Sequence, residues 1–133
     1  MRALIIDDNQ SVRMFVERVL REAGYETTTA KDGVSAQGVV LQEGAPDLVV
    51  TDESLPGMSG HEFARWLRSN FSSVKVLFLT GYVSRAYSDP LEVLDNDAYL
   101  EKPCTVNGLL QAVKMLIGPA GDASGPACAQ SAR

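Results

Sequence analysis

Two aspartates stand directly after a short apolar run near the amino terminus. The run "ALIID" at residues 3–7 ends in Asp7 and is followed by Asp8, and a second apolar run, "DLVVTD" at residues 47–52, ends in Asp52. If the two runs are parallel strands of one sheet, their carboxyl ends bring three carboxylates to the same edge. Three carboxylates so close together repel one another strongly, so we expect oxygen ligands for a hard divalent cation, with Mg²⁺ as the ion.

A hydroxyl and a cation belong to two further apolar runs. The run "VKVLFLT" at residues 74–80 ends in Thr80, and "AYLEKP" at residues 98–103 supplies Lys102. A lysine offsets part of the negative charge and can contact a phosphoryl oxygen. An aspartate beside Mg²⁺, a lysine and a hydroxyl is equipped as a nucleophile toward phosphorus, because phosphoryl transfer needs charge neutralisation and positioning. We therefore choose Asp52 as the phosphoryl acceptor.

The elements that would position these side chains alternate between strand and helix. Short apolar runs predict buried strands, and apolar positions spaced by three and four residues predict helices. We expect strands at residues 3–7, 25–29, 47–52, 74–80 and 98–103, and helices at 12–23, 33–44, 59–70 and 106–117. This order indicates an α/β protein with a doubly wound, five-stranded parallel sheet and helices on both faces.

The segment between the fourth and fifth predicted strands has a weaker pattern. Its first part, "GYVSRAYSD" at residues 81–89, has no clear apolar stripe. Asp89, Pro90 and Glu92 are typical of the N-cap, first and third positions of a helix. We therefore expect the helix of this segment to begin late and to be short.

Composition and length limit the classes of function. The chain has 133 residues, 45% of them hydrophobic and 22% charged, which suits one domain with a single core. Its formal net charge of -5 excludes the basic footprint of a nucleic-acid-binding protein. No secretory signal precedes the first strand, and no apolar run is long enough to span a membrane, so we expect a cytoplasmic protein.

The carboxyl-terminal stretch differs from the rest of the chain. It is small, polar and without periodicity, so we divide the chain into a domain at residues 1–118 and a flexible tail at 119–133. The two cysteines, Cys104 and Cys128, lack the spacing of a zinc site or a disulfide framework.

Five short motifs, in this order, resemble those of the receiver domains of two-component response regulators. They are "IIDD" at 5–8, "VVTD" at 49–52, "LPGMSGHEF" at 55–63, "FLTGY" at 78–82 and "YLEKP" at 99–103. The resemblance covers about residues 2–117 and implies a flavodoxin-like (βα)5 fold. It also implies a phosphoacceptor module of a two-component system or phosphorelay, whose phosphorylation switches a partner-binding surface.

The resemblance implies a set of metal ligands around the acceptor. Asp52 would take its phosphoryl group from the phosphohistidine of a sensor histidine kinase or histidine phosphotransfer protein. Asp8 would ligate Mg²⁺ directly and Asp7 mainly through water, with Asp52 and the backbone carbonyl of Ser54 completing the protein ligands.

The resemblance also implies how the phosphoryl group is held and read. Thr80 and Lys102 would bind its oxygens, and Tyr99 would change rotamer as Thr80 moves. The side chains of Ser54 and Tyr82 lie at positions that influence the lifetime of the phosphoryl group.

Each of these residues also has an ordinary structural interpretation. Asp8 or Asn9 could cap the first helix, and Tyr99 could be a half-buried packing residue. Thr80 could merely end a strand, and Lys102 could be a solvated charge. We assign no role to His61, which we expect to face solvent, and we expect Trp66 in the core.

Two other functions are compatible with the same residues. A haloacid-dehalogenase-like phosphohydrolase also uses a strand-end aspartate, Mg²⁺ and a lysine, but Ser54 stands where its general acid would be. A receiver segment of a hybrid kinase or larger regulator is the other alternative; Met1 directly before the first strand favours a free-standing receiver. We expect a monomer or weak dimer that catalyses only its own phosphoryl transfer and dephosphorylation.

Overall fold

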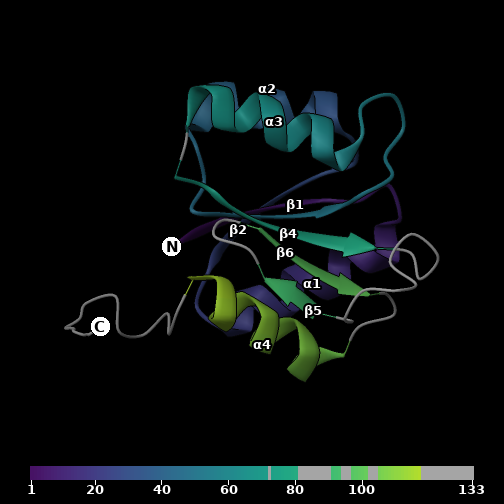
Figure 1. Cartoon of the computed structure of the whole chain (residues 1–133), viewed down its shortest axis with the longest axis vertical. Coiled ribbons are helices and arrows are strands. Elements are labelled where there is room, and N and C mark those ends of the chain that lie inside the picture. The colour runs from purple at the N-terminus through teal and green to yellow at the C-terminus, as the bar shows by residue number, and fades with distance from the viewer. Residues whose placement is uncertain (72, 81–90, 94–96, 102–104, 118–133) are drawn as a thin grey trace.

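The computed structural model describes residues 1–71, 73–80, 91–93, 97–101 and 105–117, which form a sheet covered by helices on both faces. The strand order is β2-β1-β3-β4-β6-β5. Five strands are parallel, namely β1 (Arg2–Ile6), β2 (Glu26–Ala30), β3 (Leu48–Asp52), β4 (Lys75–Thr80) and β6 (Asp97–Glu101). On one face lie α2 (Gly33–Glu43) and α3 (Gly60–Asn70), and on the other lie α1 (Gln10–Glu22) and α4 (Val106–Ile117) (Figure 1). The predicted doubly wound parallel sheet is confirmed.

The sheet separates two apolar clusters, one under each helical layer. Side chains alternate across a strand, so Ala3 and Ile5 of β1 belong to the cluster under α1 and α4, whereas Leu4 and Ile6 belong to the cluster under α2 and α3. All four are buried, which explains why β1 is apolar at every position after Arg2. Trp66 packs at the margin of the second cluster and is only partly buried.

Short polar side chains begin the helices near the carboxyl edge of the sheet. Asn9 caps α1 by accepting a hydrogen bond from the amide of Val12, which decides between the two caps considered from the sequence. Asp32 caps α2 in the same way through the amide of Ser35, and that bond lowers the pKa of Asp32 below its ordinary 3.8. These caps end each strand-to-helix connection within a few residues.

The α3 helix begins with a capping box. Ser59 accepts a hydrogen bond from the amide of Glu62, and the Glu62 carboxylate accepts one from the amide of Ser59. The first helical residue, Gly60, donates its amide hydrogen to the carbonyl of Glu53 at 3.0 Å. The start of α3 is therefore tied to the backbone that follows β3.

A sixth strand corrects one prediction. Residues Leu91–Val93 form β5, which pairs antiparallel with β6 at the edge of the sheet. Glu92 was predicted as the third residue of a helix, and this is wrong; Asp89 and Pro90 lie outside the described residues. The edge of β6 offers backbone hydrogen bonds to the segment that precedes it, and this pairing overrides the capping pattern.

The predicted tail at residues 119–133 and the two cysteines, Cys104 and Cys128, fall outside the described residues. None of the helices in the described ranges is long and apolar enough to cross a bilayer.

Candidate functional site

Three carboxylates lie together at the carboxyl ends of β1 and β3. The register pairs Ile6 with Thr51, so the residues that follow them, Asp7 and Asp52, come side by side. One oxygen from each of Asp7, Asp8 and Asp52 lies within 4.8 Å of the other two. Asp7 is buried, with 1% of its surface exposed, while Asp52 is half-buried and Asp8 is exposed. The cluster therefore opens to solvent on the side of Asp8.

The donor set and its spacing fit a small hard cation. Oxygen ligands lie about 2.0–2.1 Å from Mg²⁺, so two ligands on opposite sides of the ion are about 4.2 Å apart. The observed limit of 4.8 Å is slightly wider. The three carboxylates fit such an ion if one reaches it through water or if the cluster closes by a few tenths of an ångström.

Asp7 is held by contacts from three directions. Its amide donates to the carbonyl of Ala30 at 3.2 Å, and its carboxylate accepts a hydrogen bond from the amide of Asn9 at 2.9 Å. The guanidinium of Arg13 donates to the Asp7 carbonyl oxygen at 2.7 Å. Arg13 was not singled out from the sequence, although a cation in the first turns of a helix that follows an acidic pair is a recognisable signal. Arg13 therefore adds positive charge beside the acids.

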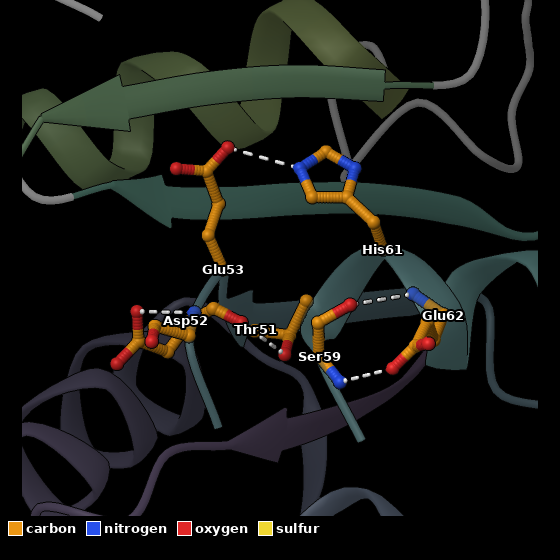
Figure 2. A network of polar contacts seen from close by, with 7 residues as sticks. Thr51, Asp52, Glu53, Ser59, His61 and Glu62 are labelled. Carbon is orange, nitrogen blue, oxygen red and sulfur yellow. Dashed lines mark hydrogen bonds and ion pairs between the residues drawn. The ribbon is translucent and has the colours of Figure 1, made fainter. Parts of the chain in front are cut away.

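The Asp52 backbone and side chain are each bonded to a neighbour. The hydroxyl of Thr51 donates to the Asp52 carbonyl at 3.0 Å (Figure 2). The amide of Ser54 donates to the Asp52 carboxylate at 3.2 Å. Both bonds are local in the sequence. Ser54 is thus adjacent to the carboxylate, and the role of its carbonyl as a metal ligand stays a prediction.

Thr80 is the last residue of β4 and is fully buried. The register pairs Asp52 with Leu79, so Thr80 lies one residue beyond the level of Asp52 on the neighbouring strand. Its hydroxyl has no hydrogen-bond partner within the described part of the chain. Lys102 and Tyr82 lie outside the described residues.

Tyr99 lies inside the cluster under α2 and α3. It is the third residue of β6 and pairs with Phe78, two positions before the level of Thr80. The two rings stack with centroids 4.9 Å apart, and 9% of Tyr99 is exposed. Tyr99 is therefore buried two residues before the end of β6, and its ring packs beside the sheet.

His61 is half-buried, so the expectation that it faces solvent holds only in part. Its Nε2 lies 2.9 Å from a carboxylate oxygen of Glu53, and its ring stacks on Phe78. The start of α3 is bonded to the backbone that follows β3, so this residue reaches the sheet while part of its side chain stays exposed. The spacing of three residues to the buried Ala64 places His61 beside the buried face of α3, but it does not identify the residues that His61 contacts.

Comparisons with known proteins agree with this arrangement. The family model described as "Response regulator receiver domain" matches residues 3–114. The chain is 35% identical over 127 residues to the response regulator MprA of Mycobacterium sp. (strain KMS), covering 94% of this chain but only 54% of that protein. It is 29% identical over 113 residues to sporulation initiation phosphotransferase F of Bacillus subtilis (strain 168), covering 85% of this chain and 90% of that protein.

Solved structures show the same architecture. The chemotaxis response regulator CheY4 of Vibrio cholerae superimposes with a TM-score of 0.72 at 28% sequence identity, covering 87% of this chain and 98% of that one. The fold, the acidic edge and the match over nearly the whole described length thus agree. The chain belongs to the response regulator receiver domains, the phosphoacceptor modules of two-component signalling.

Proposed function

We propose that Asp52 accepts a phosphoryl group from the phosphohistidine of a sensor histidine kinase or a histidine phosphotransfer protein. The observation that carries this proposal is the set of three carboxylates within 4.8 Å at the carboxyl edge of the sheet. Of the three, Asp52 is half-buried and lies between Asp7 and the strand that ends in Thr80. An acceptor needs this combination of access and nearby polar groups.

The reaction exchanges one phosphorus bond for another. A carboxylate oxygen of Asp52 attacks phosphorus, the bond between phosphorus and the donor nitrogen breaks, and the imidazole leaves with the bonding electron pair. Asp7, Asp8, Asp52 and the carbonyl of Ser54 would hold Mg²⁺, with Asp7 acting mainly through water. When bound, Mg²⁺ neutralises charge on the phosphoryl oxygens.

Thr80 and Lys102 would hold the transferred group. A buried hydroxyl without a partner costs about 1–3 kcal/mol, and a phosphoryl oxygen beside Asp52 would supply the missing acceptor. Lys102 follows the last residue of β6, which pairs with Thr80, and would contribute its charge to the same oxygens. Tyr99 would change rotamer as Thr80 moves.

The proposal also covers the domain organisation, the location and the oligomeric state of the protein. Residues 1–118 form the receiver domain, and 119–133 form a tail that the domain does not need. The protein works in the cytoplasm as a monomer or weak dimer, without direct contact to nucleic acid or membrane, and catalyses only its own phosphoryl transfer and dephosphorylation. A free-standing receiver and a receiver segment of a hybrid kinase or larger regulator would both use this site in the same way.

Intact mass spectrometry after incubation with acetyl phosphate tests the acceptor. The wild-type protein should gain one phosphoryl group when Mg²⁺ is present and none in excess chelator, because the acidic cluster repels an anionic donor without the cation. The Asp52→Asn variant should gain none.

Asp47→Asn is the matched control. Asp47 directly precedes the same strand at its opposite end, so its variant should be labelled like the wild type. Equal labelling of Asp52→Asn, or labelling of the wild type in chelator, would show that the acceptor or the role of the metal is wrong.

A further inference from the structure

The side chain of His61 links the backbone beside Asp52 to the ring of Tyr99. Its Nε2 contacts the carboxylate of Glu53 at 2.9 Å, and Figure 2 shows these two side chains pointing toward one another. Its ring lies 4.2 Å from that of Phe78 and 5.8 Å from that of Tyr99, centroid to centroid. His61 is the only histidine of the chain, and no role in the phosphoryl transfer has been given to it above.

The imidazole is held on more than one side. Interplanar angles of 14° to Phe78 and 28° to Tyr99 show that the three rings are close to parallel. The side chain of Glu53 is only 17% exposed and that of His61 41%, so their contact is partly shielded from water. A carboxylate bonded to its edge therefore restricts the imidazole to an orientation that permits stacking.

Glu53 in turn is held by two elements. Its amide donates to the carbonyl of Leu79 in β4 at 3.3 Å, and its carbonyl accepts from the amide of Gly60 at 3.0 Å. A Cβ atom at Gly60 would overlap the carbonyl oxygen of Asp52, so the first turn of α3 lies directly against the acceptor backbone. A displacement at Asp52 therefore acts on the element that carries His61.

We propose that His61 is a positioning residue for Tyr99, and that Glu53 holds the His61 ring in the orientation that keeps Tyr99 stacked inside the cluster. The proposal rests on the proposed function in one respect, since it takes Tyr99 to be the residue that responds to the phosphoryl group. A dianion on Asp52 repels the neighbouring Glu53 carboxylate and so acts on the same ring stack. Tyr99 is then coupled to Asp52 from two sides, through Thr80 and through Glu53 and His61.

The expected size of the effect follows from the energy of aromatic stacking. Loss of one stacked partner should change the ratio of inward to outward Tyr99 by about 2- to 13-fold. His61→Ala removes both the ring and the contact with Glu53, whereas His61→Phe keeps the ring alone. Glu53→Ala keeps the imidazole but removes the carboxylate that contacts its Nε2.

Fluorine NMR of protein labelled with 3-fluorotyrosine measures this ratio without phosphorylation. The chain has four tyrosines, and loss of one signal in Tyr99→Phe assigns Tyr99. In His61→Ala the Tyr99 signal should shift and its solvent isotope effect should rise, because the ring moves toward water. Glu53→Ala should shift it less, and His61→Phe least. Arg65→Ala, an exposed change on the same helix, should leave it in place.

Tyr25 serves as an internal reference for the fold, since it is buried in the cluster on the other face of the sheet. If the Tyr99 signal of His61→Ala coincides with that of the wild type, the proposal is overturned. If Tyr25 shifts as well, His61→Ala has disturbed the fold, and Glu53→Ala decides: an unchanged Tyr99 signal there overturns the proposal, and a shift confined to Tyr99 supports it.

Beryllofluoride with Mg²⁺ separates this proposal from the proposed function. In the wild type it should shift the Tyr99 signal, and in His61→Ala that response should fall at least about twofold, the lower limit for a lost stacking partner. A full response in His61→Ala would overturn the coupling through His61. Absence of any response in the wild type would instead count against Tyr99 as the responding residue, while the result on the unphosphorylated protein would stand.

Discussion

The hydroxyl of Thr80 combines full burial with the lack of a partner in the described residues. Most buried polar groups in proteins are hydrogen-bonded, so such a group marks either a site for a ligand or a local cost to stability. In the function proposed here, Thr80 is both a site for a ligand and a local cost to stability. If Thr80 holds the phosphoryl group as proposed, the unphosphorylated protein has the cost and the phosphoryl group removes it.

Replacing Thr80 by valine should separate these two effects. Thr80→Val removes a hydroxyl that has no partner among the described residues and should raise the free energy of unfolding of the unphosphorylated protein by about 1 kcal/mol. The same change should weaken beryllofluoride binding, because an oxygen of that anion loses its donor. Chemical denaturation and a beryllofluoride titration measure the two quantities.

Thr51→Val is the control for this prediction. Thr51 is also buried near a strand end, but its hydroxyl donates to the Asp52 carbonyl at 3.0 Å, so this substitution should destabilise the protein. If Thr80→Val is destabilised as much as Thr51→Val, then the Thr80 hydroxyl already has a partner in the unphosphorylated protein.

The α3 helix begins directly against the end of β3, the strand that carries Asp52. Its first residue, Gly60, touches the Asp52 carbonyl oxygen so closely that a side chain there must displace the backbone. Gly38, in the exposed middle of α2, has open space where a Cβ would lie. A side chain is therefore excluded at Gly60 by contact with β3, whereas the space at Gly38 would accept one.

Substitution of each glycine by alanine tests this difference. Gly60→Ala should lower the free energy of unfolding by about 1–3 kcal/mol through overpacking, and should slow labelling of Asp52 by acetyl phosphate. Gly38→Ala should raise it by about 0.5–1 kcal/mol, because alanine has the higher helix propensity, and should leave labelling unchanged. Thermal denaturation measures the change in stability, and the rate of mass gain measures the labelling of Asp52. A neutral Gly60→Ala would mean that α3 can move away from Asp52 without cost.

The elements that could be predicted from the sequence are those whose signals are local and repeated. Apolar runs ending in Asp7, Asp52 and Thr80 predicted three strands within a residue or two of their observed ends, and the parallel order followed from their alternation with helices. The strand at Leu91–Val93 was missed because the capping pattern of Asp89, Pro90 and Glu92 favours a helix, whereas the chain here pairs antiparallel with β6, the next strand.

The candidate site was predictable to a similar extent. Strand-end position was sufficient to bring Asp7, Asp8 and Asp52 together. The side chains around them depend on the angle at which α3 approaches β3, so the contacts of His61 with Glu53 and Phe78 could not be derived from spacing alone. The depth of Tyr99 in the sheet likewise required the register between β4 and β6.

For the molecule as a whole, the tail at residues 119–133 is expected to contribute little. It has no apolar periodicity with which to pack against the domain. Removal of these residues should leave the melting temperature and the labelling of Asp52 nearly unchanged. A melting temperature lowered by more than about 4 °C, the shift for roughly 1 kcal/mol in a domain of this size, would show that the tail packs on the domain.

Phosphorylation should be transmitted over a limited part of the molecule. Thr80 is followed by residues 81–89, which have no clear apolar stripe, so we expect a response there to cost less than a response of the packed clusters. Amide hydrogen exchange with and without beryllofluoride should therefore change most within residues 80–99. Changes restricted to Asp7, Asp8 and Asp52 would indicate a site that binds the group without transmitting it.

The strand order also has a consequence for the chain during its synthesis. The strand β1 lies between β2 and β3, and β4 and then β6 are added outward from β3 in the order in which the ribosome makes them. The three aspartates of the acidic cluster, Asp7, Asp8 and Asp52, are synthesised well before Thr80 and Tyr99. A nascent chain thus acquires the complete set of carboxylates in its first three strands, whereas the residues that would respond to phosphorylation arrive with later strands. The carboxylates proposed to bind the cation and the residues proposed to transmit the signal are therefore separated in the order of biosynthesis.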